Sequence, residues 1–126
     1  MVNVHASGGI KMLEASRRAL EGYDQPPFLI GVTVLTSLSE DALKEVGLQG
    51  VSEQVLRLAT LAKECELDGV VCASSDTKDI KNEFGKDFLT VTPGIRPFLS
   101  DLDDQSRGST PEAAGNIGCD FLVSGR

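Results

Sequence analysis

Residues 28–35 read FLIGVTVL, an uninterrupted apolar run that is rich in β-branched side chains. A strand of a parallel sheet reads in this way when both of its faces are buried. Pro26 and Pro27 stand directly before the run, and Thr36 and Ser37 follow it. The run therefore predicts a central strand of an α/β sheet.

Further short apolar runs lie on both sides of this strand and alternate with helical patterns. Such alternation indicates βαβ units, a parallel sheet and right-handed crossovers. The other predicted strands are 1–6, 70–73, 88–92 and 121–123. The predicted helices begin after Gly9, after a capping box at 37–40, near Ser52, near Asp76 and at Pro111, where Thr110 is the predicted N-cap.

Two architectures fit this pattern: an open doubly wound sheet and part of a (β/α)8 barrel. A whole barrel needs about 200–250 residues, and the 126 residues present supply a little over half of that. The chain begins inside a predicted strand and stops just after another, so both terminal strands look uncovered. We therefore expect a single partial domain over residues 1–126, cut from a larger chain.

Composition excludes several classes of protein. With 12 Lys+Arg and 19 Asp+Glu the formal net charge is −7, which argues against nucleic acid or an anionic membrane as the main partner. No apolar run is long enough to span a membrane and no basic leader is present, so a cytoplasmic location is expected. Cys65, Cys72 and Cys119 lack any C-x-x-C spacing and predict three thiols in a reducing compartment, with no metal site.

In both architectures, functional groups gather at the carboxyl ends of the strands. The residues expected there are hydroxyl residues, glycines, two arginines and one histidine: 5–7, 36–37, 74–75, 93–96 and 124–126. Asp68 and Asp120 fall at strand entrances, the opposite edge. No Asp, Glu or Lys is expected at a strand exit, so the chain predicts binding groups without acid–base equipment.

The last two strand exits combine glycine with arginine, as Gly94 with Arg96 and Gly125 with Arg126. Glycine lets backbone N–H groups approach an anion, and arginine adds a two-pronged charged donor. Phosphate binding is one interpretation, and a turn glycine beside a solvated arginine is the other; spacing alone leaves both open.

Three other features receive structural interpretations. His5 is read as a hydrogen-bonded structural residue, although a strand exit would also suit a base. The acidic cluster Asp101, Asp103 and Asp104 is read as a solvated loop face. Residues 8–9 open a helix with two glycines, but no dinucleotide-binding fingerprint follows.

Several motifs occur in an order and spacing that resemble one family. They are MVNVHASGG, LIGVTVLTS, LDGVVCAS, VTPGIRP followed by DQSR and TPEAA, and the closing DFLVSGR, and together they span nearly all of the chain. The sequence resembles the C-terminal portion of bacterial orotidine 5′-phosphate decarboxylases.

The resemblance implies a (β/α)8 TIM barrel, of which this chain would supply roughly the fourth to the eighth strand. It implies decarboxylation of orotidine 5′-phosphate to UMP in pyrimidine biosynthesis by a homodimer without cofactor or metal. Thr36 would lie beside the pyrimidine, and Arg96 at the base of the phosphate-side loop. Gln105 would reach over the ligand, and Gly125 and Arg126 would hold the phosphate.

The resemblance also implies what this chain lacks. The family uses a lysine within an Asp-x-Lys-x-x-Asp motif, and this sequence contains no such motif. No catalytic residue is therefore assigned, and the chain alone is predicted to be inactive. The competing hypotheses are a non-catalytic phosphate-binding half-barrel and a barrel enzyme for another sugar phosphate; Gln105 and Thr36 disfavour the latter.

Overall fold

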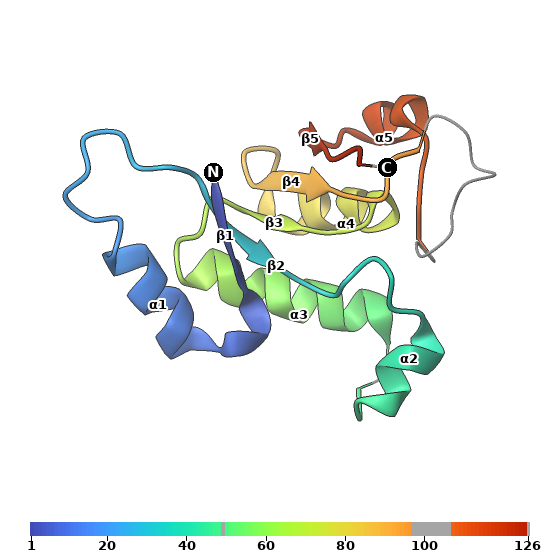
Figure 1. The fold of residues 1–126 in the computed structure, drawn as a ribbon, viewed down its shortest axis with the longest axis horizontal. Coiled ribbons are helices and arrows are strands. Elements are labelled where there is room, and N and C mark those ends of the chain that lie inside the picture. The colour runs from blue at the N-terminus through green and yellow to red at the C-terminus, as the bar shows by residue number, and fades with distance from the viewer. Residues whose placement is uncertain (49, 97–106, 126) are drawn as a thin grey trace.

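The computed structural model describes residues 1–48, 50–96 and 107–125, and its centre is one parallel sheet (Figure 1). The sheet order is β1-β2-β3-β4-β5, the order of the chain itself. The strands are β1 (Val2–His5), β2 (Leu29–Val32), β3 (Gly69–Val71), β4 (Leu89–Thr92) and β5 (Phe121–Leu122). The predicted parallel α/β sheet is confirmed.

Helices connect the strands. They are a 3-10 turn η1 (Ala6–Gly8), α1 (Ile10–Arg18), α2 (Glu40–Glu45), α3 (Val51–Glu64), α4 (Ser74–Phe84) and α5 (Pro111–Ile117). In Figure 1, α1 and α3 run along the same side of β1 and β2. Across the described ranges, no helix combines the length and the apolar character that a membrane crossing requires.

The strand order separates the two predicted architectures. A doubly wound sheet reverses its strand order at a switch point, which places helices on both faces. The five strands described here follow one another without a reversal. With right-handed crossovers this order keeps the helices on one face, as in a barrel wall.

The strands are shorter than the apolar runs that predicted them. Phe28 and Leu35, the ends of the predicted central strand, are 49% and 47% exposed, outside β2. The last contacts of this segment come from Thr33, whose backbone N–H and hydroxyl both donate to the carbonyl of Val71. Apolar character continues past the point where the ladder of backbone hydrogen bonds ends.

The caps of two helices differ in how well the sequence predicted them. Thr110 accepts a hydrogen bond from the Ala113 N–H at 3.2 Å, as predicted for α5. The capping box at 37–40 is wrong, because Ser39 and not Ser37 caps α2, accepting from the Ala42 N–H at 3.3 Å. Glu40 Oε1 instead accepts from the Val51 N–H at 2.7 Å, which caps the following helix, α3.

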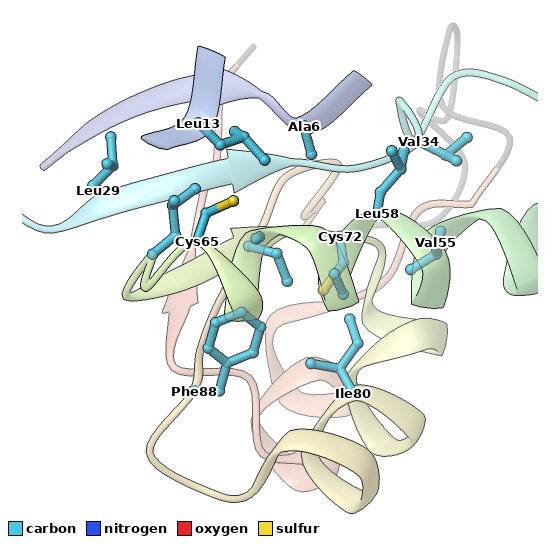
Figure 2. Packing of buried hydrophobic residues seen from close by; sticks show 14 of the residues in the cluster. Ala6, Leu13, Leu29, Val34, Val55, Leu58, Cys65, Cys72, Ile80 and Phe88 are labelled. Carbon is cyan, nitrogen blue, oxygen red and sulfur yellow. The ribbon is translucent and has the colours of Figure 1, made fainter. Parts of the chain in front are cut away.

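The main core lies between the sheet and the helices (Figure 2). Leu29 and Val70 face α3 in this core, and β2 approaches the helix closely at Gly31, where a Cβ would lie 3.1 Å from Ala62 Cβ. Side chains alternate along a strand, so Ile30, also buried, faces the other side of the sheet.

Both edges of the sheet expose apolar side chains. Within the described residues β1 pairs only with β2, and β5 only with β4. Val2 on β1 is 44% exposed, and Phe121 and Leu122 on β5 are each 40% exposed. The predicted lack of cover on the terminal strands is confirmed.

Candidate functional site

The exits of β4 and β5 lie side by side at the carboxyl edge of the sheet. Val91 pairs with Phe121 and Thr92 with Leu122, and the Val123 N–H donates to the Thr92 carbonyl at 2.9 Å. The segment after Thr92 therefore starts next to the segment after Leu122. The predicted neighbourhood of these two strand exits is confirmed.

The β4 exit is held by two backbone hydrogen bonds. The Arg96 N–H donates to the Ser109 carbonyl at 3.0 Å, and the Ser109 N–H donates to the Gly94 carbonyl at 3.2 Å. Gly94 has a φ of +76°, a left-handed conformation that disfavours other residues. These bonds fix the backbone on which Arg96 is carried.

Arg96 is a buried cation at this edge, only 9% exposed. Its Nη1 donates to the Ile95 carbonyl at 3.4 Å, and no carboxylate of the described residues forms an ion pair with it. A guanidinium withdrawn from water gains strongly from an anionic partner. Arg96 is therefore a candidate group for binding an anion.

The other predicted site residues divide into placed and unplaced ones. Thr36 is buried in the turn after β2, and Gly125 is exposed just beyond β5, where a Cβ would meet no atom within 4 Å. His5 is exposed at the end of β1. Gln105, Arg126 and the predicted acidic cluster 101–104 lie outside the described residues.

One charged pair at the carboxyl edge was missed by the sequence analysis. Arg107 Nη1 donates to Asp76 Oδ2 at 2.8 Å, and the two side chains are only 16% and 8% exposed. The expectation that no carboxylate lies at a strand exit is wrong, because α4 begins at Ser74 and not near Asp76. Asp76 thus falls in the first turn, where its carboxylate also accepts the Ala73 N–H at 3.2 Å. An acidic residue three positions after a possible N-cap was the available signal.

Arg107 also contacts the β2 exit. Its Nη2 donates to the carbonyls of Val34 and Leu35, each at 3.3 Å. Beside this contact lies a cavity of about 360 Å³, whose walls include Ser39, Ser52 and Ser75 as well as both members of the ion pair. One side chain therefore joins the exits of β2 and β3 to the segment that follows β4.

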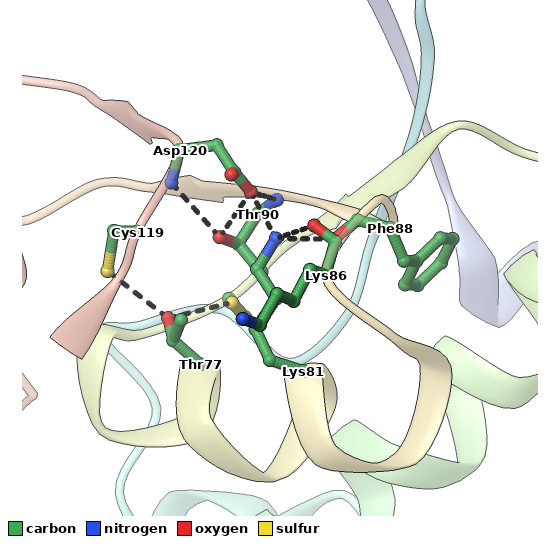
Figure 3. A network of polar contacts seen from close by, with 8 residues as sticks. Thr77, Lys81, Lys86, Phe88, Thr90, Cys119 and Asp120 are labelled. Atoms are coloured by element: carbon green, nitrogen blue, oxygen red, sulfur yellow. Dashed lines mark hydrogen bonds and ion pairs between the residues drawn. The ribbon is translucent and has the colours of Figure 1, made fainter.

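The opposite edge of the sheet carries a different polar network (Figure 3). Asp120 Oδ2 accepts from Lys81 Nζ at 2.6 Å, from the Thr90 N–H at 2.7 Å and from the Thr90 hydroxyl at 3.0 Å. Asp68 likewise accepts the Leu29 N–H at 2.7 Å. Both carboxylates bind strand entrances, as predicted, and serve the sheet instead of the candidate site.

The thiols and acidic residues offer little to a metal. Cys65, Cys72 and Cys119 are free, as expected, and burial raises the pKa of the Cys72 thiol to about 12. In the part of the chain that the structure describes, no three His, Cys, Asp or Glu side chains gather in a group that could hold a metal ion.

Curated relatives match the whole chain. It is 54% identical to an orotidine 5′-phosphate decarboxylase of Saccharophagus degradans and 56% identical to one of Chromobacterium violaceum, with 100% of this chain aligned in both cases. These alignments cover 53% and 51% of the two relatives. The chain thus spans about half the length of the curated relatives that it matches.

A solved structure and a family model agree with these relatives. The crystal structure of orotidine 5′-phosphate decarboxylase from Lactobacillus acidophilus matches with a TM-score of 0.77 and 38% identity, covering 96% of this chain and 52% of that one. The expected placement in the C-terminal portion is not supported by these matches, which bear out only the family. The model of the orotidine 5′-phosphate decarboxylase / HUMPS family matches residues 1–126, and the chain belongs to that family.

Proposed function

We propose that the protein to which this chain belongs decarboxylates orotidine 5′-phosphate to UMP, and that this chain supplies contacts to the phosphate and the pyrimidine. The observation that carries the proposal is the match of every residue to decarboxylase relatives, at 54% identity for the Saccharophagus degradans protein. A fold alone would not identify the reaction, because barrels host many chemistries.

The phosphate contacts are assigned to the exits of β4 and β5. These exits are neighbours, and the first of them carries the buried Arg96 and the left-handed Gly94. Gly125, which has open space around it, would present its N–H to the phosphate. Arg126 would add a guanidinium and Gln105 an amide, as the resemblance implies.

The pyrimidine contact is assigned to Thr36. This residue stands in the turn after β2, at the same edge of the sheet as Arg96. A hydroxyl at this place would donate to a ring carbonyl or accept from a ring N–H. The proposed ligand thus extends along the carboxyl edge, with its base near β2 and its phosphate near β4 and β5.

The bond-breaking chemistry needs groups that this edge does not provide. Loss of CO2 from the ring leaves a carbanion, which requires a nearby cation that can also donate a proton. Among the described residues at the edge, the charged side chains are two arginines and Asp76, which is paired with Arg107. Arginine holds its proton too tightly for this role. We therefore propose that the chain alone binds nucleotide without turnover, and that phosphate binding assists a reaction whose acid comes from elsewhere.

Calorimetric titration of the 126-residue chain with UMP and with uridine tests this proposal. We expect UMP to bind and uridine to bind at least about tenfold more weakly, because only UMP brings the phosphate. Arg126→Gln should lose most of that preference, whereas Arg18→Gln, which alters an exposed pair with Glu14, should keep it. Equal affinity for UMP and uridine, or release of CO2 from orotidine 5′-phosphate by the chain alone, would contradict the proposal.

A further inference from the structure

Arg107 joins three parts of the carboxyl edge that are far apart in the sequence. Its Nη1 binds Asp76 in the first turn of α4, 31 residues away, and its Nη2 binds the carbonyls of Val34 and Leu35, 73 and 72 residues away. Two residues further on, Ser109 exchanges backbone hydrogen bonds with Gly94 and Arg96. A single short segment therefore connects the exits of β2, β3 and β4.

The carbonyls that Arg107 binds belong to the peptide units directly before Thr36. The Leu35 carbonyl is part of the peptide bond that carries the Thr36 N–H, so its hydrogen bond constrains the backbone of Thr36. On the other side, the Arg96 N–H is held by Ser109. The residue assigned to the pyrimidine and the residue assigned to the phosphate are thus held from the same segment.

The ion pair with Asp76 sets the direction of the guanidinium. The Asp76 carboxylate is 8% exposed, is fixed by the Ala73 N–H, and meets Arg107 Nη1 at 2.8 Å. With Nη1 directed to Asp76, the planar guanidinium turns Nη2 toward Val34 and Leu35. Lysine has no such fork and could keep the ion pair only by giving up the carbonyls.

We propose that Arg107, oriented by Asp76, is a positioning residue that holds Thr36 in register with Arg96, so that base and phosphate are recognised together. The inference rests on the proposed function for the identity of the ligand. Arg107 itself touches no ligand in this assignment. Its effect is expected on recognition of the base and not on recognition of the phosphate.

The first experiment needs no ligand. In backbone NMR spectra of the chain, Arg107→Lys should shift the amide signals of Leu35 and Thr36, whose peptide carbonyls lose their donors, while amides on the helix face of α1 stay in place. Thermal unfolding of the same variant shows whether it is folded. Unchanged Leu35 and Thr36 signals in a folded Arg107→Lys chain would overturn the inference, whatever the chain binds.

The second experiment separates base from phosphate. We expect Arg107→Lys and Arg107→Gln to weaken UMP binding about tenfold, as loss of charge-assisted hydrogen bonds would, while ribose 5-phosphate binding changes less than about twofold. Asp76→Asn keeps an oxygen for the Ala73 N–H and should show the same selective loss. Equal weakening for both ligands would mean that Arg107 is merely structural and would refute the positioning role. If the unaltered chain binds neither ligand, the proposed function fails, and the NMR comparison still decides whether Arg107 holds Thr36.

Discussion

Lys81 Nζ lies 2.6 Å from Asp120 Oδ2, and this pair joins α4 to the entrance of β5 (Figure 3). Lys81 also donates to the carbonyls of Lys86 and Phe88, at 2.9 and 2.8 Å, and Asp120 also accepts from Thr90. The ammonium and the carboxylate therefore satisfy the polar backbone where β4 begins. Asp68 does the same one βα unit earlier, by accepting the Leu29 N–H.

The first prediction concerns acid stability. Burial acts to raise the pKa of Asp120, but hydrogen bonds from Lys81 and Thr90 outweigh it and lower the pKa below its usual value. A lowered folded-state pKa gives stability that is complete above the unfolded-state pKa and is lost as the pH falls through the folded-state value. Asp120→Asn should therefore cost about 1–3 kcal/mol at neutral pH and progressively less below about pH 4. Urea unfolding from pH 2 to 7 measures this.

Glu14→Gln is the matched control for Asp120→Asn. Its carboxylate is 51% exposed and lies 3.9 Å from Arg18, a surface pair that contributes little to stability. We expect no measurable change at neutral pH. If Asp120→Asn behaves like Glu14→Gln, the network at the strand entrances does not stabilise the sheet.

The second prediction contrasts two glycines. A Cβ on Gly69 would overlap the backbone carbonyl oxygen of Leu89 on the neighbouring strand, so Gly69→Ala should destabilise the fold by about 3 kcal/mol. A Cβ on Gly115, inside α5, would meet no atom within 4 Å, so Gly115→Ala should stabilise the chain by about 1 kcal/mol. Thermal unfolding of both variants measures the difference. A loss of stability in Gly115→Ala would show that α5 depends on something other than helix propensity.

Much of the fold was predictable because local patterns and the sheet agree. The apolar runs, the Thr110 cap and the glycine at the end of α5 all report on nearby residues. Strand ends were less predictable, since Phe28 and Leu35 are apolar yet exposed. The capping box failed because Glu40 has two possible partners in sequence, and only the folded chain brings the Val51 N–H to it.

The site was predictable to the extent that it depends on strand order. Parallel strands place Gly94 and Arg96 beside the exit of β5 once the order is known. The Asp76–Arg107 pair joins residues 31 apart through a segment without regular structure, and no periodicity signals such a contact. The roles of Gln105 and Arg126 stay predictions, as does Thr36 beside the pyrimidine.

The third prediction concerns thiol reactivity. Cys72 is fully buried, and its pKa is raised to about 12, chiefly by burial. Cys119 is partly exposed, with its Sγ 3.2 Å from the Thr77 hydroxyl. At pH 8 the thiolate fraction of Cys72 is lower than that of an ordinary thiol by about three orders of magnitude. Iodoacetamide should therefore label Cys119 first and Cys72 only on unfolding, as peptide mass spectrometry would measure. Denatured protein, in which all three thiols react alike, is the control, and early labelling of Cys72 would mean that the sheet opens locally.

The last prediction concerns the open edges of the sheet. Val2 on β1 and Phe121 on β5 are 44% and 40% exposed, and each strand has a paired neighbour on one side only within the described chain. Unpaired strand edges with apolar side chains promote association between chains. We therefore expect the 126-residue chain to self-associate in sedimentation velocity experiments, and we expect Phe121→Lys to reduce that association. Tyr23→Lys, at a loop residue that is 65% exposed, tests whether added charge alone has this effect. A monomeric unaltered chain, or equal effects of the two lysine variants, would show that the edges do not drive association.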